Sequence, residues 1–173
     1  SWRARRLLLM TLRSPPEVVR SRCGAMGPTR VAVPFGPMAA VSPLEFPAAA
    51  FAEMLAHAYA GYPLEACGLL VGKGTRIHRF VPTTNETASA RIYAIPGKEL
   101  LRAEMAAEDD GLEIIGVFHS HTHSEPYPSP TDVAQAPDPN WHYVIVSLKR
   151  EAPETRSYRI VDGIIAEEPV AVG

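Results

Sequence analysis

The stretch Val117-Phe-His-Ser-His-Thr-His-Ser-Glu-Pro-Tyr-Pro-Ser-Pro-Thr-Asp132 decides how this chain is interpreted. The preceding apolar run, Leu112 to Phe118, predicts a strand that carries two histidines at its carboxyl end. Side chains at positions i and i+2 of a strand project from the same face, so the two imidazoles can converge on one cation. Four polar groups then lie within fourteen residues: His119, His121, Ser129 and Asp132.

Asp132 is expected to complete this site. Ser129-Pro130-Thr131-Asp132 has Ser at the N-cap, Pro at the first helical position and an acid at the third. A helix N-terminus favours an anion by about 0.3 to 1 kcal/mol, which predicts an ionised Asp132 that is ready to bind a metal. Two His and one Asp leave the fourth tetrahedral position of zinc open, as in catalytic sites. The sequence therefore predicts a hydrolytic site with one zinc ion per chain.

Length and composition predict one domain with an appended segment. The chain has 173 residues, of which 46% are apolar, enough for a buried core, and no repeat is visible. Residues 1–30 carry seven Arg and one Glu, while residues 31–173 carry ten basic and eighteen acidic groups. Because phosphate binding needs clustered Lys and Arg, the acidic main part argues against nucleic acid as a partner.

The N-terminal residues 1–38 are expected to be a disordered or non-native extension, and residues 39–173 to form the domain. The apolar run Leu7 to Leu12 is too short for a signal-peptide core or a membrane span, so no membrane partner is expected. The chain does not begin with Met, and Met26 and Met38 are candidate start sites.

The cysteines and the remaining histidines receive structural interpretations first. Cys23 and Cys67 cannot form a disulfide framework, which favours a reducing, cytoplasmic setting. Cys67 is expected to be a small buried residue at a strand start, with a redox or metal-modulating thiol as the alternative. His57 and His142 are interpreted as surface and structural residues. His123 is interpreted as solvated or substrate-facing, with a third imidazole ligand as the alternative.

Hydrophobic periodicity predicts two longer helices. Ala48 to Ala60 is Ala-rich with Phe51, Leu55 and Tyr59 at fourfold spacing, which indicates an amphipathic helix. A second helix is expected from Pro96 to Ala107, with four residues facing inward: Leu100, Leu101, Met105 and Ala106.

Several strands are predicted around these helices, with a hairpin turn at Lys73-Gly74. The predicted strands are Cys67–Val71, Arg76–Val81, Ala90–Ile95, Leu112–Phe118, Trp141–Leu148, Thr155–Val161 and Ile164–Val170. Strands mixed with a few helices point to an α+β domain with one central sheet.

The segment Pro63-Leu-Glu-Ala-Cys-Gly-Leu-Leu-Val-Gly72, followed some fifty residues later by His-Ser-His and Ser-x-x-Asp, resembles the JAMM metalloproteases of the catalytically competent (MPN+) branch. With His142-Tyr-Val-Ile-Val-Ser147 and Arg156 to Gly163, it is similar to the small actinobacterial enzymes that act on a sulfur-carrier protein. The resemblance covers about residues 40 to 170. It implies a cytidine-deaminase-like domain in which helices flank a central mixed sheet.

The resemblance also implies roles for individual residues. It places zinc on His119, His121 and Asp132, makes Glu65 the general base, and makes Ser129 a donor to the developing oxyanion. One departure is that many JAMM deubiquitinases have Pro directly after the second histidine, whereas this chain has Thr122-His123, as expected for the bacterial subgroup.

The implied reaction is hydrolysis of the amide bond after the C-terminal Gly-Gly of a ubiquitin-like sulfur carrier, with release of cysteine for cysteine biosynthesis. The alternative is an isopeptidase that removes a ubiquitin-like modifier from protein lysines. Both enzymes cleave after a glycine, so the motif does not separate them, and the sequence does not indicate an oligomeric state.

Two interpretations of other kinds stay open. His119-x-His121-x-x-x-Glu125 fits the first metal motif of a cupin, although the second histidine motif of that family is missing. A scaffold domain of the same fold could bind partners without chemistry, because a fold does not secure a function.

Overall fold

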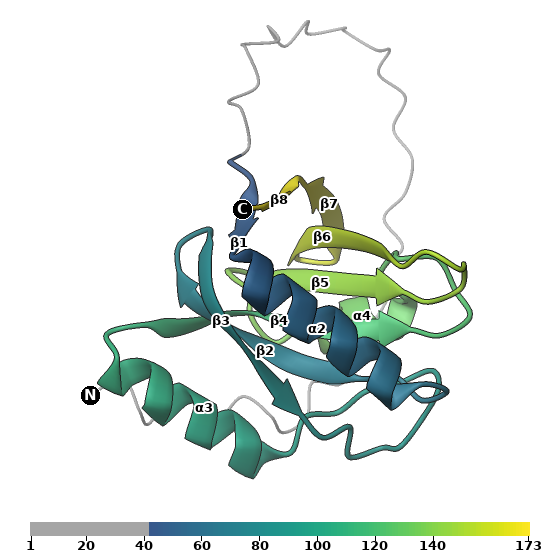
Figure 1. The fold of residues 1–173 in the computed structure, drawn as a ribbon, viewed down its shortest axis with the longest axis horizontal. Coiled ribbons are helices and arrows are strands. Elements are labelled where there is room, and N and C mark those ends of the chain that lie inside the picture. The colour runs from purple at the N-terminus through teal and green to yellow at the C-terminus, as the bar shows by residue number, and fades with distance from the viewer. Residues whose placement is uncertain (1–41) are drawn as a thin grey trace, which may run out of the picture. The chain divides into compact units, whose positions relative to one another are not determined.

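The computed structural model describes residues 42–173, which form an α+β domain around one eight-stranded mixed sheet (Figure 1). The strand order is β7-β6-β5-β4-β2-β3-β1-β8. The predicted boundary between residues 1–38 and 39–173 and the residue Cys23 lie outside the described residues. The predicted α+β class with a central mixed sheet is confirmed.

The elements follow the chain in a mixed order. The helices are α2 (Ala48–Gly61), α3 (Gly97–Asp109) and α4 (Pro130–Gln135). The strands are β1 (Leu44–Phe46), β2 (Cys67–Lys73), β3 (Arg76–Thr83), β4 (Glu113–His121), β5 (His142–Ser147), β6 (Glu154–Val161), β7 (Ile164–Glu168) and β8 (Val170–Val172).

Strand β4 is central to the site, and its pairing sets the geometry there. It runs antiparallel to β2, with Cys67 opposite His119, and parallel to β5, with His119 opposite Ile145. The prediction that this strand delivers the two histidines at its carboxyl end is confirmed, because β4 continues to His121.

The two faces of the sheet carry separate cores. One face packs against α2, through Ala50, Met54 and Ala58, and the other packs against Ala103 and Ala107 of α3. Successive strand residues alternate between the two cores, as the period of two requires. The alternation is visible in β2 and β4, where Leu70 and Phe118 lie on the α2 face and Leu69 and Val117 on the other.

Both helices form where predicted, but their buried faces differ from the prediction. In α2, Tyr59 is half exposed, and in α3, Leu101 and Met105 are more than half exposed. Phe51 and Leu55 of α2 and Leu100 of α3 pack partly buried against the cores as predicted. The buried positions of the two helices are Ala50, Met54, Ala58, Ala103 and Ala107. Within residues 42–173, no helix combines the length and the apolar character needed to cross a membrane.

The strand predicted at Ala90–Ile95 is wrong, since that segment is irregular. Its carbonyl and amide groups bond to a side chain, described below, and not to a neighbouring strand. Two short strands were not predicted: β1 pairs in parallel with β3 and with β8 at the edge of the sheet.

Gly116 allows β4 and β5 to approach each other, and its replacement tests this packing. A Cβ atom at Gly116 would overlap the backbone oxygen of His142 in the adjacent strand. We expect Gly116→Ala to lower the free energy of unfolding by about 1 to 3 kcal/mol, as overpacking commonly does, measured by urea denaturation. Gly97→Ala is the matched control, because nothing lies within 4 Å of that position. Equal stability of the two variants would contradict the packing argument.

Candidate metal centre

Three side chains from two elements converge at the carboxyl end of β4. The Nε2 atoms of His119 and His121 lie 3.1 Å apart. Oδ2 of Asp132, in the first turn of α4, lies 3.6 Å from Nε2 of His119 and 3.7 Å from Nε2 of His121. The structure therefore brings together the three residues that the sequence predicted as ligands.

These residues form the one group of His, Cys, Asp and Glu side chains in the described chain that could hold a metal ion. Each offers one ligand atom, and all these atoms lie within 4.8 Å of one another. Neutral imidazole and carboxylate suit a divalent cation, and zinc sites are built from such donors. The donor set therefore fits a single metal ion.

The charge states of His119 and Asp132 suit metal binding. Burial lowers the pKa of His119 despite its contact with Asp132. For Asp132, burial would raise the pKa, but hydrogen bonds from both histidines and from Ser129 outweigh burial and hold the pKa well below its usual value. For His121, burial would lower the pKa, but Asp132 and the Glu125 carbonyl outweigh it and raise the pKa. The ionised Asp132 and the neutral His119 are in the form that binds metals, whereas the raised pKa of His121 favours its protonated form, so this imidazole releases a proton when a metal binds.

Both imidazole rings are held by other groups. Nδ1 of His121 donates to the backbone oxygen of Glu125 at 2.7 Å, which leaves the lone pair of Nε2 facing the other ligand atoms. The His119 ring stacks on Tyr93 with centroids 4.5 Å apart. Nδ1 of His119 is buried and has no hydrogen-bond partner among the described residues.

Asp132 is held by a capping box at the start of α4. The Ser129 amide donates to Oδ2 of Asp132 at 2.7 Å, and the Asp132 amide donates to Oγ of Ser129 at 3.2 Å. The predicted helix start is therefore confirmed, with Ser129 as N-cap and Pro130 in the first turn. The bond from the Asp132 amide does not use the Ser129 hydroxyl proton, which interacts with the Asp132 carboxylate.

Glu65 lies just before β2 and is 5% exposed. Burial raises its pKa to about 7; His121 opposes this shift and Asp132 adds to it. The electrostatic interaction with both residues places the carboxyl group beside the predicted ligands. The structure thus brings Glu65, which is fifty-four residues before His119 in the sequence, to the same site.

Ser120 joins the two halves of the site, and the sequence analysis did not identify it. Its Oγ accepts from the Ala66 amide at 2.8 Å, and its own amide donates to the Ala66 oxygen at 2.9 Å. Both residues are neighbours of functional candidates in the sequence: Ala66 follows Glu65, and Ser120 lies between the two histidines. The sequence did contain one indication of this role: Ser120 lies between the two histidines in the strand, so its side chain points to the opposite face of the sheet.

Asn85 organises the loop over Glu65 and was also missed. Its Nδ2 donates to the oxygens of Glu65 at 2.9 Å and Ile92 at 3.1 Å, and its Oδ1 accepts from the amides of Thr87 and Ala94, both at 3.2 Å. The bond from residue i+2 is an Asx turn, which a polar Asn-Glu-Thr segment predicts. The bonds from Asn85 to Ile92 and Ala94 could be identified only in the structure.

Two other candidate ligands do not join the group. Glu125 points away, and its half-exposed carboxylate binds Lys149 and Arg150, each at 2.8 Å, so the cupin alternative is wrong. His123 is exposed; its Nδ1 contacts the Thr122 hydroxyl at 2.7 Å, and its ring faces Tyr62.

Cys67, His142 and His57 have structural explanations. Cys67 is fully buried as predicted, and burial raises the pKa of its thiol, which disfavours the reactive thiolate. His142 is buried and contacts a Glu168 carboxylate oxygen at 2.7 Å and the Gly74 oxygen at 3.1 Å, which confirms its structural interpretation. The surface interpretation of His57 is wrong, because Nε2 contacts the Cys67 oxygen at 3.0 Å in a partly buried position.

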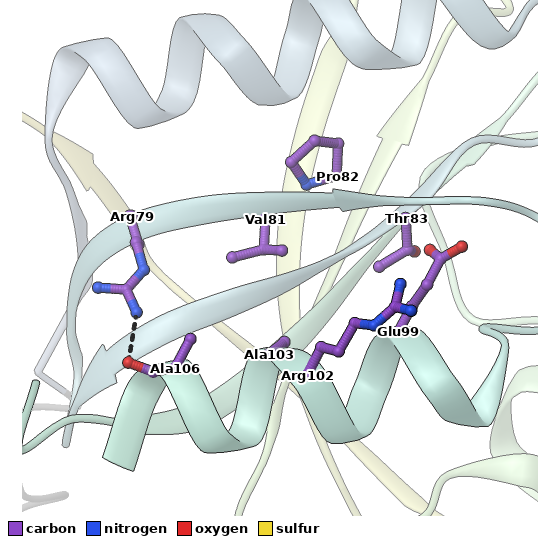
Figure 2. Close-up of a pocket in the computed structure, with 8 residues that line it drawn as sticks. All are labelled: Arg79, Val81, Pro82, Thr83, Glu99, Arg102, Ala103 and Ala106. Carbon is purple, nitrogen blue, oxygen red and sulfur yellow. Dashed lines mark hydrogen bonds between the residues drawn. The ribbon is translucent and has the colours of Figure 1, made fainter. Parts of the chain in front are cut away.

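A separate cleft of about 360 Å³ lies between α3 and β3 (Figure 2). It contains none of the predicted site residues. Arg79 donates to Asp110 and to the Ala106 oxygen, while Glu99 accepts from the Thr84 amide. The hydrogen bonds of Arg79 and Glu99 connect the helix region to the strand region, so we assign these two charged side chains a structural role.

Comparisons with known proteins agree with this architecture. The family model described as prokaryotic homologues of the JAB domain matches residues 47–161. The CysO-cysteine peptidase of Mycobacterium tuberculosis is 45% identical over 122 residues, which cover 69% of this chain and 84% of that protein. The desampylase of Haloferax volcanii is 34% identical over 105 residues, 55% of this chain and 73% of that one. A solved structure from Desulfitobacterium hafniense has a TM-score of 0.67 at 32% identity and covers 75% of this chain and 92% of its own.

The raised pKa of Glu65 predicts a pH-dependent loss of stability in chelator-treated protein. Unfolded Glu65 ionises near 4.5 and folded Glu65 near 7, so ionisation destabilises the fold increasingly between these pH values and fully above 7. At about 1.4 kcal/mol per pH unit, a shift from 4.5 to about 7 corresponds to at most about 3 to 4 kcal/mol. We expect Glu65→Gln to raise the melting temperature of the metal-free protein at pH 8 and to change it little at pH 4.5. An equal shift at both pH values would contradict the assigned cause.

Proposed function

The chain belongs to the family of prokaryotic homologues of the JAB domain, and from that premise we propose that it cleaves, with zinc, the amide bond after the C-terminal glycine of a ubiquitin-like sulfur carrier, releasing cysteine. Its relatives are named peptidases, and it is a hydrolase of the JAMM type. The observation that carries the proposal is the convergence of His119, His121 and Asp132 beside the buried Glu65.

His119, His121 and Asp132 would hold the zinc ion through Nε2, Nε2 and Oδ2. Three protein ligands leave a fourth position open, as in catalytic zinc sites. Bound zinc supplies Lewis acidity, which lowers the pKa of a water at that position to about 7 and polarises the scissile carbonyl. The capping box at α4 and the Glu125 carbonyl hold two of the three ligands in place.

Glu65 and Ser129 would act on the proton and on the developing charge. A carboxyl group with a pKa of about 7 can accept a proton from the attacking water near neutral pH and then donate it to the leaving amine. The Ser129 hydroxyl can donate its proton to the oxyanion of the tetrahedral intermediate in place of the Asp132 carboxylate. Hydrolysis then needs no covalent intermediate with the protein.

The substrate part of the proposal is supported by the CysO-cysteine peptidase, which is 45% identical over 122 residues. The 34% identity to a desampylase favours the second candidate, an isopeptidase that removes a ubiquitin-like modifier from lysines. Both substrates end in glycine before the scissile bond. A cytoplasmic location, expected from the cysteine usage, belongs to the same proposal.

A direct assay separates the two substrates. The purified protein is incubated with a Gly-Gly-ended carrier that bears a C-terminal cysteine and, separately, with a lysine-linked conjugate, and intact mass is followed with and without a zinc chelator. We expect chelator-sensitive loss of cysteine alone. Cleavage of only the lysine conjugate would establish the isopeptidase instead, and cleavage of neither would favour a non-catalytic scaffold.

Two substitutions separate metal binding from proton transfer. Glu65→Gln should retain stoichiometric zinc and lose turnover by about 100-fold or more, because general acid-base catalysis contributes at least that factor. His119→Ala should lose both zinc and turnover. Metal analysis and the cysteine-release assay measure the two properties on the same preparations, and an active Glu65→Gln enzyme would refute the assigned base.

A further inference from the structure

The loop between His121 and α4 is fixed by three successive backbone oxygens. The central one, from Glu125, accepts the Nδ1–H of His121 at 2.7 Å. A carbonyl can only accept, so this contact selects the tautomer in which Nε2 has the free lone pair. The position of the Glu125 peptide therefore sets the direction in which His121 presents Nε2.

The two flanking oxygens are held by the sheet. Oγ of Ser147, at the end of β5, donates to the Ser124 oxygen at 2.6 Å. The hydroxyl of Tyr158, in β6, donates to the Pro126 oxygen at 2.6 Å. These two bonds form what we call the carbonyl clamp, defined by Ser147 and Tyr158.

Both donors of the carbonyl clamp are rigid. Ser147 is 2% exposed and Tyr158 is 1% exposed. Ser147 ends β5, which pairs with β4 and β6, and Tyr158 lies within β6, which pairs with β5 and β7. The carboxylate of Glu125 adds a third attachment through Lys149 and Arg150, but these groups are about half exposed, so water and salt weaken that attachment. The Tyr127 amide also donates to the Glu125 oxygen, at 2.8 Å, within the loop itself, whereas the two buried hydroxyls attach the loop to the sheet.

We propose that Ser147 and Tyr158 are positioning residues that hold the Glu125 carbonyl against His121 and thereby preorganise the metal site. The inference rests on the proposed metal site and extends it to two residues outside the group of ligands. Groups that orient a metal-binding histidine commonly change metal affinity by about 10- to 100-fold when they are removed.

The chain offers a matched control for the test. Tyr143 is also buried, at 2% exposure, and its hydroxyl donates to a backbone oxygen, that of Asp138, at 2.7 Å. Tyr143 and Tyr158 are paired neighbours in β5 and β6 and belong to the same apolar core. Tyr143→Phe removes this bond and the bond that the hydroxyl accepts from the Asp138 amide at 3.2 Å, and it leaves the carbonyl clamp intact.

The experiment compares Tyr158→Phe and Tyr143→Phe in the full chain by zinc competition against a chromophoric chelator and by thermal unfolding of the metal-free proteins. We expect similar losses of melting temperature, with zinc affinity lowered about 10-fold in Tyr158→Phe and unchanged in Tyr143→Phe. At a pH at which the His121 imidazole is neutral, nitrogen-15 shifts of His121 in the metal-free protein should show a mixture of tautomers in Tyr158→Phe and one tautomer in the parent chain. Ser147→Ala should lower zinc affinity in the same direction.

Wild-type zinc affinity and a single His121 tautomer in Tyr158→Phe would overturn the inference, as would an equal loss of affinity in Tyr143→Phe. These results leave the proposed function intact, because the parent chain still binds zinc. A parent chain that binds no zinc, or whose binding survives His121→Ala, would instead overturn the metal site itself and the inference with it.

Discussion

The site depends on the antiparallel pairing of β2 with β4. This pairing sets Cys67 opposite His119, and Ser120 closes it by bonding to both the amide and the oxygen of Ala66. Glu65 therefore lies at the end of the sheet where both histidines emerge. Because side chains alternate along a strand, a slip of one residue would turn the two imidazoles to the α2 face and separate them from the carboxylates. The register is thus a condition for chemistry as much as for packing.

Much of the site could be predicted because its information is local. The spacing of His119 and His121 fixes a common face in any strand, and Ser129-Pro130-Thr131-Asp132 specifies a helix start whose N-cap and acid bond to each other. The link to Glu65 required the family resemblance, since nothing in the local sequence joins a residue before β2 to one in β4. Ser120 and the Tyr158 hydroxyl were missed for the same reason, because their partners lie 54 and 32 residues away.

The errors in the fold have physical causes of their own. Large apolar side chains predicted the buried faces of α2 and α3 only in part: Tyr59, Leu101 and Met105 are exposed, and four of the five buried helix positions are alanines, with Met54 as the fifth. Close approach to the sheet favours such small side chains. Residues 90–95 have an apolar composition typical of a strand. Their backbone is bound by the Asn85 side chain, which takes the place of a neighbouring strand and leaves the segment irregular.

The burial of the site residues limits the shape of the polypeptide that can reach them. His119 is 1% exposed, His121 4% and Glu65 5%. A helix with its side chains is about 10 Å across, too broad to bring its peptide bonds to atoms so deeply covered. A bare, extended chain end that lacks side chains is much thinner. Side chains so deeply covered therefore favour an extended chain end over a folded segment as the part of a substrate that reaches them.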